Sequence, residues 1–247
     1  MVETEVAPGV HRVEDAHTNW YLVEDEGRLT VVDAGVPTSW RSLQDAVRRI
    51  RRSLDDIAAV VLTHAHFDHI GSAERIRTTL HVPVHVHVND VPLTRHPTQY
   101  ARERSPLYYV ATKPKALPVV AQFVATRAFF PRPIGAVETF GDEGTLPVPG
   151  SPRIVPTPGH TIGHVSFHLP DRGVLIAGDA VVTFNPYTGE HGPQIVARSA
   201  NADSPRALAS LDALAATGAP VVLTGHGPAW RDGAEEIAEQ ARRAGIS

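Results

Sequence analysis

The chain has 247 residues, of which 42% are apolar and 20% are charged, and its formal net charge at pH 7 is −4. This length and composition predict one globular domain that spans residues 1–247. The absence of cysteine excludes disulfides, a thiolate nucleophile and cysteine-ligated metals. The sequence has no signal-peptide pattern and no apolar run of the roughly 18–20 residues that a membrane span needs, so we expect no transmembrane segment and a cytoplasmic location.

An early predicted strand, Leu29–Val32, ends at the sequence Asp33-Ala34-Gly35. A carboxylate at the end of a strand has two common roles. It either belongs to a turn or accepts a hydrogen bond from a metal-binding histidine and so orients that histidine. The sequence leaves both interpretations of Asp33 open.

The next predicted strand, Ala58–Leu62, leads into the densest cluster of metal-type side chains in the chain. Residues 63–69 read Thr-His-Ala-His-Phe-Asp-His, which is the pattern H-x-H-x-D-H. Imidazole and carboxylate are the ligands that suit zinc and its first-row neighbours. The candidate ligands here are His64, His66, Asp68 and His69.

Three later predicted strands each end close to one further metal-type side chain. The runs Arg153–Gly159, Gly173–Gly178 and Ala219–Gly225 lead into His160, Asp179 and His226. In packed architectures of strands and helices, the strand ends converge on one edge, where sites are built. We therefore expect these three residues to join the histidine cluster. Two other histidines, His164 and His168, are interpreted as mostly structural.

The segment 92–137 lies between the two groups of predicted ligands and has seven basic residues but only one acidic residue. Because Ala116–Phe130 is predicted to be helical, we interpret the segment as a helical insert. One role is a cap that binds a small-molecule substrate of anionic or acylated character. The second is a surface for a homodimer or an anionic membrane, and the third is a solvated basic face. The acidity of the whole chain argues against nucleic acid as a partner.

The motifs, taken together and in this order, resemble those of the metallo-β-lactamase superfamily, and more closely its glyoxalase II-like hydrolase branch. The resemblance runs from about Gly9 to Gly227. It implies an α+β fold, a four-layer αββα sandwich with two sheets face to face and helices outside. The matching motifs are DAG at 33–35, THAHFDH at 63–69, TPGHTIGH at 157–164, AGD at 177–179 and GHG at 225–227.

The resemblance also implies a ligand set for two metal ions. His64, His66 and His160 would hold one ion, Asp68, His69 and His226 would hold the other, and Asp179 would bridge them. Asp33 would orient one of the histidines. The implied cofactors are two zinc ions, with manganese or iron as alternatives in one or both sites.

Two divalent ions that share a carboxylate can bind a hydroxide at neutral pH. We therefore expect a dinuclear-zinc hydrolase in which a metal-bridging hydroxide attacks the carbonyl of an ester, thioester or lactone, with Asp68 also relaying a proton. One alternative is an oxidoreductase with a single iron, similar to the persulfide dioxygenases. The other is a relative that binds a ligand without catalysis.

Departures from the glyoxalase II pattern bear on the substrate. After His226 the chain has one predicted helix, Gly233–Arg243, in place of the helical domain that helps those enzymes bind glutathione. Their Gly/Cys-rich segment after the bridging aspartate is replaced by Val181–Tyr187. Val182 stands where acyl-homoserine lactonases have a substrate-contacting tyrosine. The sequence therefore favours neither a glutathione thioester nor a homoserine lactone.

Overall fold

Buried apolar strands form two β-sheets that face each other in the computed structural model, which describes residues 1–247. The first sheet follows chain order: β1 (Val2–Ala7), β2 (Val10–Asp15), β3 (Thr18–Asp25), β4 (Arg28–Val32), β5 (Ile57–Val61), β6 (Val84–His87) and β7 (Glu138–Phe140). The second has the order β13 (Val221–Thr224), β10 (Val174–Gly178), β9 (Val165–Leu169) and β8 (Arg153–Pro156). A separate hairpin pairs β11 (Val182–Phe184) with β12 (His191–Gln194).

Alternation along the strands explains why each sheet is covered on both faces. Trp20 and Leu22 of β3 pack toward the outer helices, whereas Tyr21 and Val23 pack toward the second sheet. All four are essentially inaccessible to solvent. Successive side chains of a strand point to opposite faces, so one strand supplies two separate cores.

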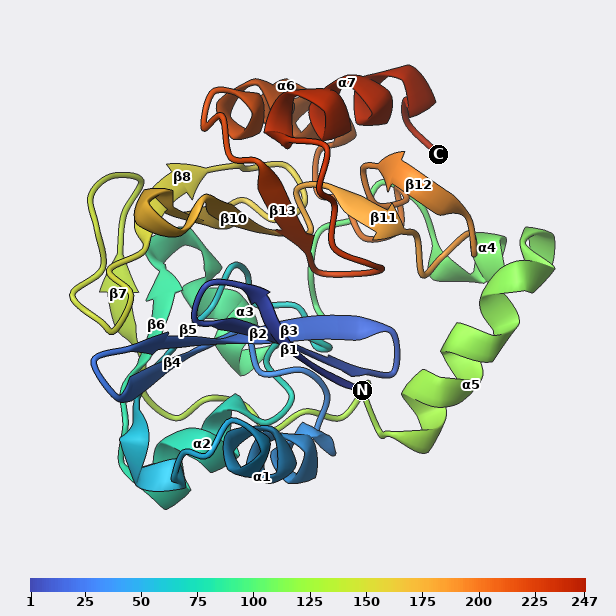
Figure 1. Ribbon diagram of the computed structural model, residues 1–247. Helices are drawn as coiled ribbons and strands as arrows, with labels where there is room; N and C mark the ends of the chain where they lie inside the picture. Colours follow the sequence, from blue (N-terminus) through green and yellow to red (C-terminus); the bar gives the residue numbers. More distant parts are fainter.

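Four helices form the outer layers (Figure 1). The first sheet is covered by α1 (Ser39–Arg49) and α2 (Ala73–Leu80), and the second by α6 (Ser204–Ala215) and α7 (Ala234–Ala244). The predicted four-layer αββα sandwich is therefore confirmed. None of the helices has the length and hydropathy required to cross a lipid bilayer.

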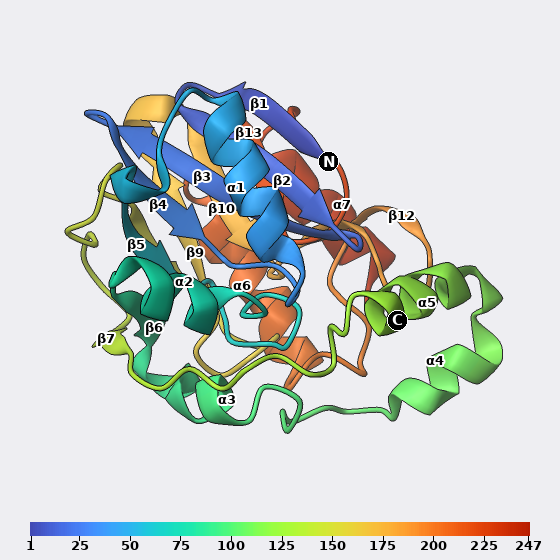
Figure 2. The same ribbon diagram turned by 90° about the horizontal axis from the view of Figure 1, so that it is seen from below.

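The predicted helical insert is also present, and it lies beside the sandwich (Figure 2). It contains α3 (Val91–Arg95), α4 (Pro106–Thr112) and α5 (Leu117–Ala125). The prediction of one helix over Ala116–Phe130 was too long, because the helix ends before Arg127. That residue adopts a left-handed φ of 56°, and the Ala128 N–H then donates to the Phe123 carbonyl at 2.8 Å.

Strand direction brings the two sets of strand ends to the same edge of the sandwich. β4, β5 and β6 run parallel in the first sheet, and β10 and β13 run parallel in the second. β8 and β10 are each antiparallel to β9, so β8 has the direction of β10. The Val165 N–H donates to the Thr63 carbonyl at 2.9 Å and links the two sheets at this edge.

Candidate metal centre

All seven candidate ligands lie in loops that leave this edge, and all are buried. Each is 6% exposed or less. The apolar strands hold the loops in place, so the polar side chains that follow them cannot turn to solvent. The residues come from the loop after β5 (His64, His66, Asp68 and His69), the loop after β8 (His160), the end of β10 (Asp179) and the end of β13 (His226).

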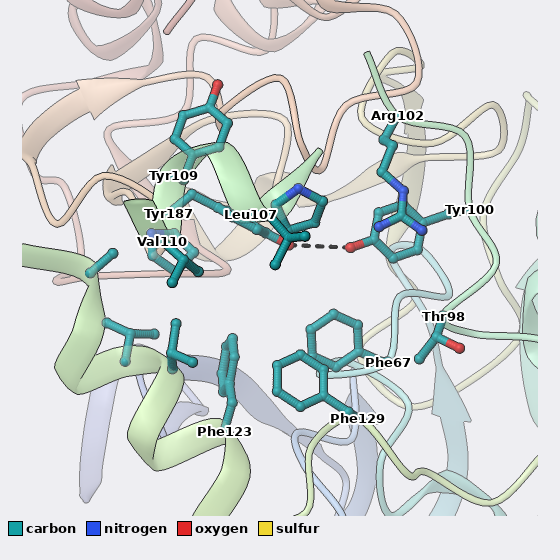
Figure 3. Close-up of a pocket in the computed structure, with 15 residues that line it drawn as sticks. Phe67, Thr98, Tyr100, Arg102, Leu107, Tyr109, Val110, Phe123, Phe129 and Tyr187 are labelled. Carbon is teal, nitrogen blue, oxygen red and sulfur yellow. Dashed lines mark hydrogen bonds between the residues drawn. The ribbon is translucent and has the colours of Figure 1, made fainter. Parts of the chain in front are cut away.

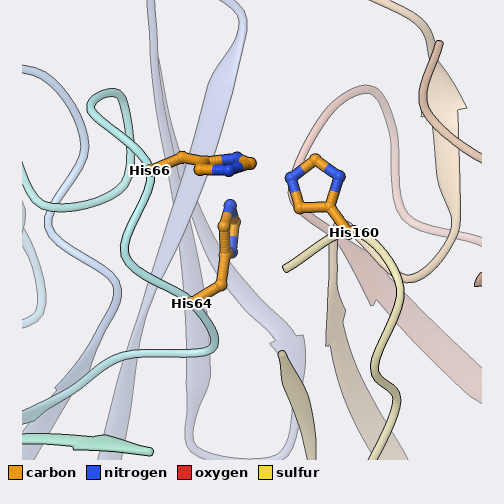
Figure 4. Close-up of side chains that lie close together, drawn as sticks. All are labelled: His64, His66 and His160. Carbon is orange, nitrogen blue, oxygen red and sulfur yellow. The ribbon is translucent and has the colours of Figure 1, made fainter. Parts of the chain in front are cut away.

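Among the seven candidate ligands the potential donor atoms form two groups, each with its atoms within 4.8 Å of one another, and a third such group joins Asp33 to His64 and His69. The first group is His64, His66 and His160, whose rings face one another from two different loops (Figure 4). The second group is Asp68, His69 and His226. Each of these two groups therefore takes side chains from both sheets.

Asp179 lies between the two groups. Its Oδ2 is 3.3 Å from His160 Nε2 in the first group and 3.2 Å from His226 Nε2 in the second. Its Oδ1 is 3.6 Å from His69 Nε2. One carboxylate thus faces side chains of both groups, which is the position that a shared ligand would need.

Several of these buried atoms have no hydrogen-bond partner. They are the Nε2 atoms of His64, His66, His69 and His160, and the Oδ1 atom of Asp179. A buried polar atom without a partner costs roughly 1–3 kcal/mol, so a cluster of five at one point needs an explanation. Neutral imidazole nitrogens around a carboxylate form a donor set that fits divalent metal ions.

Burial and neighbouring charge set the protonation of the cluster. Burial, followed by the adjacent histidines, holds the pKa of His64 and of His66 well below the usual value, which leaves both rings neutral. Burial opposes ionisation of Asp179, but positive charge on His226 and His69 outweighs it and holds the pKa of that carboxyl well below its usual range. His64 and His66 are therefore neutral, whereas the nearby carboxylates outweigh burial and raise the pKa of His69 and His226, so these two rings carry protons that a metal ion would have to displace.

Hydrogen bonds at Nδ1 fix the orientation of the histidine rings. His160 Nδ1 lies 2.9 Å from Asn201 Oδ1, and His226 Nδ1 donates to the His17 carbonyl at 2.7 Å. His64 Nδ1 lies 3.0 Å from Thr63 Oγ1. With Nδ1 engaged, each ring directs Nε2 toward the centre. No pattern in the sequence indicated Asn201 or the His17 carbonyl.

Asp33 makes the corresponding contact to His69. Its Oδ2 lies 3.0 Å from His69 Nδ1, and it accepts hydrogen bonds from the Thr63 N–H and hydroxyl, each at 2.8 Å. Asp33 itself has a left-handed φ of 60°. Of the two interpretations of this residue, its position at the His69 ring favours the orienting one.

We expect Asp33→Asn to lower metal affinity by about 10- to 100-fold, because the amide cannot match the carboxylate as an acceptor for both Thr63 and His69. The measurement is a competition titration of zinc against a chelator. The exposed Asp55→Asn serves as the matched control. Wild-type affinity in the Asp33 variant would show that this residue is only a turn carboxylate.

Two buried side chains, His164 and Asp90, fix the positions of the ligand loops. His164, interpreted from sequence as structural, accepts a hydrogen bond from the Asp179 N–H at Nε2, 3.0 Å away. Asp90 accepts from the Ala65 N–H at 3.1 Å, the Thr161 hydroxyl at 2.7 Å and the Gly163 N–H at 2.9 Å. Asp90 therefore ties the loop that carries His64 and His66 to the loop that carries His160. No motif in the sequence points to Asp90.

Residue 225 must be a glycine because its backbone passes close to the cluster. A Cβ at Gly225 would clash with Asp179 Oδ1 and would lie 3.0 Å from His69 Cε1. Any other residue would therefore displace either the carboxylate or the loop that carries His226. The glycines that flank the predicted ligands thus have a steric role in at least this case.

An apolar cavity of about 270 Å³ adjoins the cluster (Figure 3). Phe67, which lies between two candidate ligands in the sequence, forms part of its wall, and α4 and α5 form half of the rest. The Tyr100 and Tyr187 hydroxyls are 3.2 Å apart at one side of it, and the Tyr100 ring lies 4.1 Å from the His66 ring, centre to centre. Burial is the main reason why the pKa of each of these two phenols is raised, so both remain protonated at neutral pH.

Known proteins are similar to this chain in sequence. Residues 13–226 match the family model of the metallo-beta-lactamase superfamily. The chain is 29% identical over 237 residues to a probable metallo-hydrolase of Bacillus subtilis (strain 168), YflN, which covers 90% of this chain and 85% of the relative. It is 32% identical over 202 residues to the uncharacterized protein Rv2581c of Mycobacterium tuberculosis (strain ATCC 25618 / H37Rv), covering 78% and 80% of the two chains.

Solved structures support the same fold. A metallo-beta-lactamase family protein of Thermus thermophilus, TTHA1429, superposes with a TM-score of 0.70 at 24% identity, covering 96% of this chain and 79% of that one. TTHA1623 in a di-iron-bound form superposes with a TM-score of 0.61 at 23% identity, covering 93% and 96%. The family match extends over most of the chain and includes both groups of buried histidines, so this chain belongs to the metallo-beta-lactamase superfamily.

Proposed function

We propose that this chain is a dinuclear metal-dependent hydrolase of a carbonyl substrate, namely an ester, thioester or lactone. The observation that carries the proposal is the position of Asp179, whose two oxygens face histidines of both groups at 3.2–3.6 Å. The name of the B. subtilis relative, a probable metallo-hydrolase, supports the same class of reaction.

Under this proposal each group holds one ion, and zinc is the expected metal. His64, His66 and His160 would hold the first, Asp68, His69 and His226 would hold the second, and Asp179 would be shared. When bound, the ions would supply hydroxide at neutral pH and a Lewis acid for the carbonyl oxygen. Asp33, Asn201 and the His17 carbonyl keep the rings oriented.

Asp68 is the residue proposed to move the proton. Its Oδ2 lies 3.5 Å from His226 Nε2 and accepts a hydrogen bond from the Thr18 hydroxyl at 3.3 Å. It is the most exposed of the seven residues, at 6%, so it is the one best placed to meet a leaving group. Its carboxylate would take a proton from the attacking water and deliver it to the departing oxygen or sulfur.

The insert at 92–137 is proposed to be a cap on a single catalytic domain, rather than a separate unit. Val119 and Phe123 of α5 pack with Phe67 in one apolar cluster, so the insert contacts the ligand loop directly. The protonated Tyr100 hydroxyl stands at the same junction and can donate a hydrogen bond to a substrate oxygen. A cap in this position would also exclude water from the reacting carbonyl.

The test begins with metal content, measured by plasma mass spectrometry on protein made without added metal. We expect about two divalent ions per chain. The same preparation is then assayed against a panel of esters, thioesters and lactones, before and after removal of metal with a chelator. Activity should disappear with the metal and return when zinc is restored.

A different result would redirect the assignment. Close to one iron per chain, with oxygen consumed when a persulfide is added, would replace the hydrolase with an oxidoreductase. Two bound ions with no turnover across the whole panel would instead favour a relative that binds a ligand without catalysis.

A further inference from the structure

We propose that the apolar cavity beneath the insert binds the hydrocarbon chain of the substrate, so that the enzyme acts on acyl compounds whose straight chain has about eight to ten carbons. This inference rests on the proposed hydrolase function for the chemistry at the carbonyl. It assigns the cavity itself from its shape, its lining and its place beside the ligand loop.

The lining of the cavity selects an apolar occupant. Eleven of its fifteen lining residues are hydrophobic, and Arg102 is the only charged one. The Arg102 guanidinium lies 5.0 Å from the centre of the Tyr100 ring, and Arg102 is exposed to solvent. No charged group points from α4 or α5 into the cavity, because these helices contribute only apolar residues and Tyr109 to its wall. An uncharged, apolar group is therefore the matching ligand.

The size of the cavity indicates a chain rather than a single ring. Its volume is about 270 Å³. An apolar cavity of roughly 150 Å³ holds one benzene, and a methylene takes up about as much room as a water molecule, roughly 30 Å³. The volume therefore corresponds to about nine carbon atoms.

The two ends of the cavity differ in their exposure to solvent. Phe67, 4% exposed, lies at the inner end between two candidate metal ligands, whereas Leu107 and Val110 of α4 are 75% and 40% exposed at the outer end. Figure 3 shows Phe67, Phe123 and Phe129 facing the tyrosine pair across the space. A chain that fills it from the outer end toward Phe67 brings its polar head to the tyrosines.

Tyr100 connects this cavity to the metal centre. It lines the apolar cavity and also a second, smaller cavity of about 160 Å³ that includes His66 and His160. The carbonyl of an acyl compound bound in the apolar cavity would thus lie on the side of Tyr100 where the candidate ligands are. This arrangement separates the two parts of an amphipathic substrate, with the hydrocarbon under the insert and the reacting group among the histidines.

The first experiment measures kcat/KM for 4-nitrophenyl esters of two to twelve carbons. We expect an increase of about two- to fourfold for each added methylene up to eight to ten carbons, and no increase beyond that length. The second measures binding of decanoate to the same holoenzyme by calorimetry, with acetate as the control for binding through the carboxylate alone. Decanoate should bind at least tenfold more tightly than acetate.

Val120 of α5 lines the cavity and is only partly buried, so Val120→Phe places a ring in the cavity with little disturbance of the core. We expect this variant to lose the dependence on chain length and at least tenfold in decanoate affinity. Val124→Phe is the matched control, because Val124 is on the same helix, 64% exposed and outside the cavity lining. If Val120→Phe does not fold, Val110→Phe, at the outer end, gives the same comparison.

The outcomes separate this inference from the proposed function. If no ester is hydrolysed but decanoate binds and Val120→Phe prevents it, the hydrolase assignment fails and the chain-binding cavity stands. If esters are hydrolysed at rates independent of chain length, and decanoate binds no better than acetate, the cavity assignment is overturned and the hydrolase stands. Equal loss of decanoate affinity in the Val124 variant would place binding on the outer surface and overturn the cavity assignment as well.

Discussion

Asp179→Ala is expected to reduce bound metal from about two ions per chain to one or fewer and to lower kcat/KM by at least about 1,000-fold. The reason is geometric, because Asp179 is the one side chain within 3.6 Å of His69, His160 and His226 together. Its loss removes the negative charge at the centre of the cluster. Metal analysis and steady-state kinetics on the same preparation make the measurement.

The fold of this variant should survive, because Asp179 has no role in the three cores that hold the layers together. Its backbone N–H still donates to His164, so the end of β10 keeps its position. Asp171→Ala, at an exposed site on the same half of the chain, is the control. Full activity with two bound ions in the Asp179 variant would refute the shared-ligand assignment.

Asp90→Ala should lower the free energy of unfolding by roughly 2–5 kcal/mol and also weaken metal binding. The carboxylate accepts three hydrogen bonds, from Ala65, Thr161 and Gly163, and none of these donors can reach water because Asp90 is 1% exposed. Removing it leaves buried N–H groups unpaired in both loops that carry the first group of histidines. Urea unfolding of the metal-free variant measures the stability, and chelator competition measures the affinity.

Two further variants make this prediction specific. Asp90→Asn keeps one acceptor oxygen and should recover part of the stability. Asp232→Ala removes an exposed carboxylate and should change neither quantity. If Asp90→Ala were as stable as the wild type and bound metal as tightly, the two loops would be held by their strands alone, and the three hydrogen bonds would be incidental.

Local features of the sequence predicted that the candidate ligands gather at one sheet edge, whereas the four-layer fold was implied by the resemblance to the metallo-β-lactamase superfamily. Short apolar runs predict strands, and the residue after each strand lies at the sheet edge, so Asp179 and His226 could be placed near each other although 47 positions separate them. The side chains that support the ligands could not be found in this way. Asn201 and Tyr100 lie in loops and Asp90 ends a short 3₁₀ helix before α3, and the role of each depends on contacts that only the packed structure creates.

The extent of the helix in the insert was mispredicted for a related reason. Apolar residues resume at Ala128–Phe130 after Thr126 and Arg127, so the sequence favours a longer helix. The chain turns at Arg127 instead, which places Ala128 against the cluster around Phe67 and Phe123 and positions Phe129 at the apolar cavity. Tertiary packing determines where this helix ends, and the local sequence alone does not predict that position.

Each group of candidate ligands contains residues from both sheets, and this has a consequence for how the protein is assembled. His64 and His66 come within reach of His160, and Asp68 and His69 within reach of His226, only after the sheets have packed. A metal ion would therefore bind only after the two sheets have packed, and it would then link the two halves of the chain. The binding free energy of the ion would add to the stability of the packed sheets, so loss of metal would destabilise the sandwich in addition to removing the proposed activity.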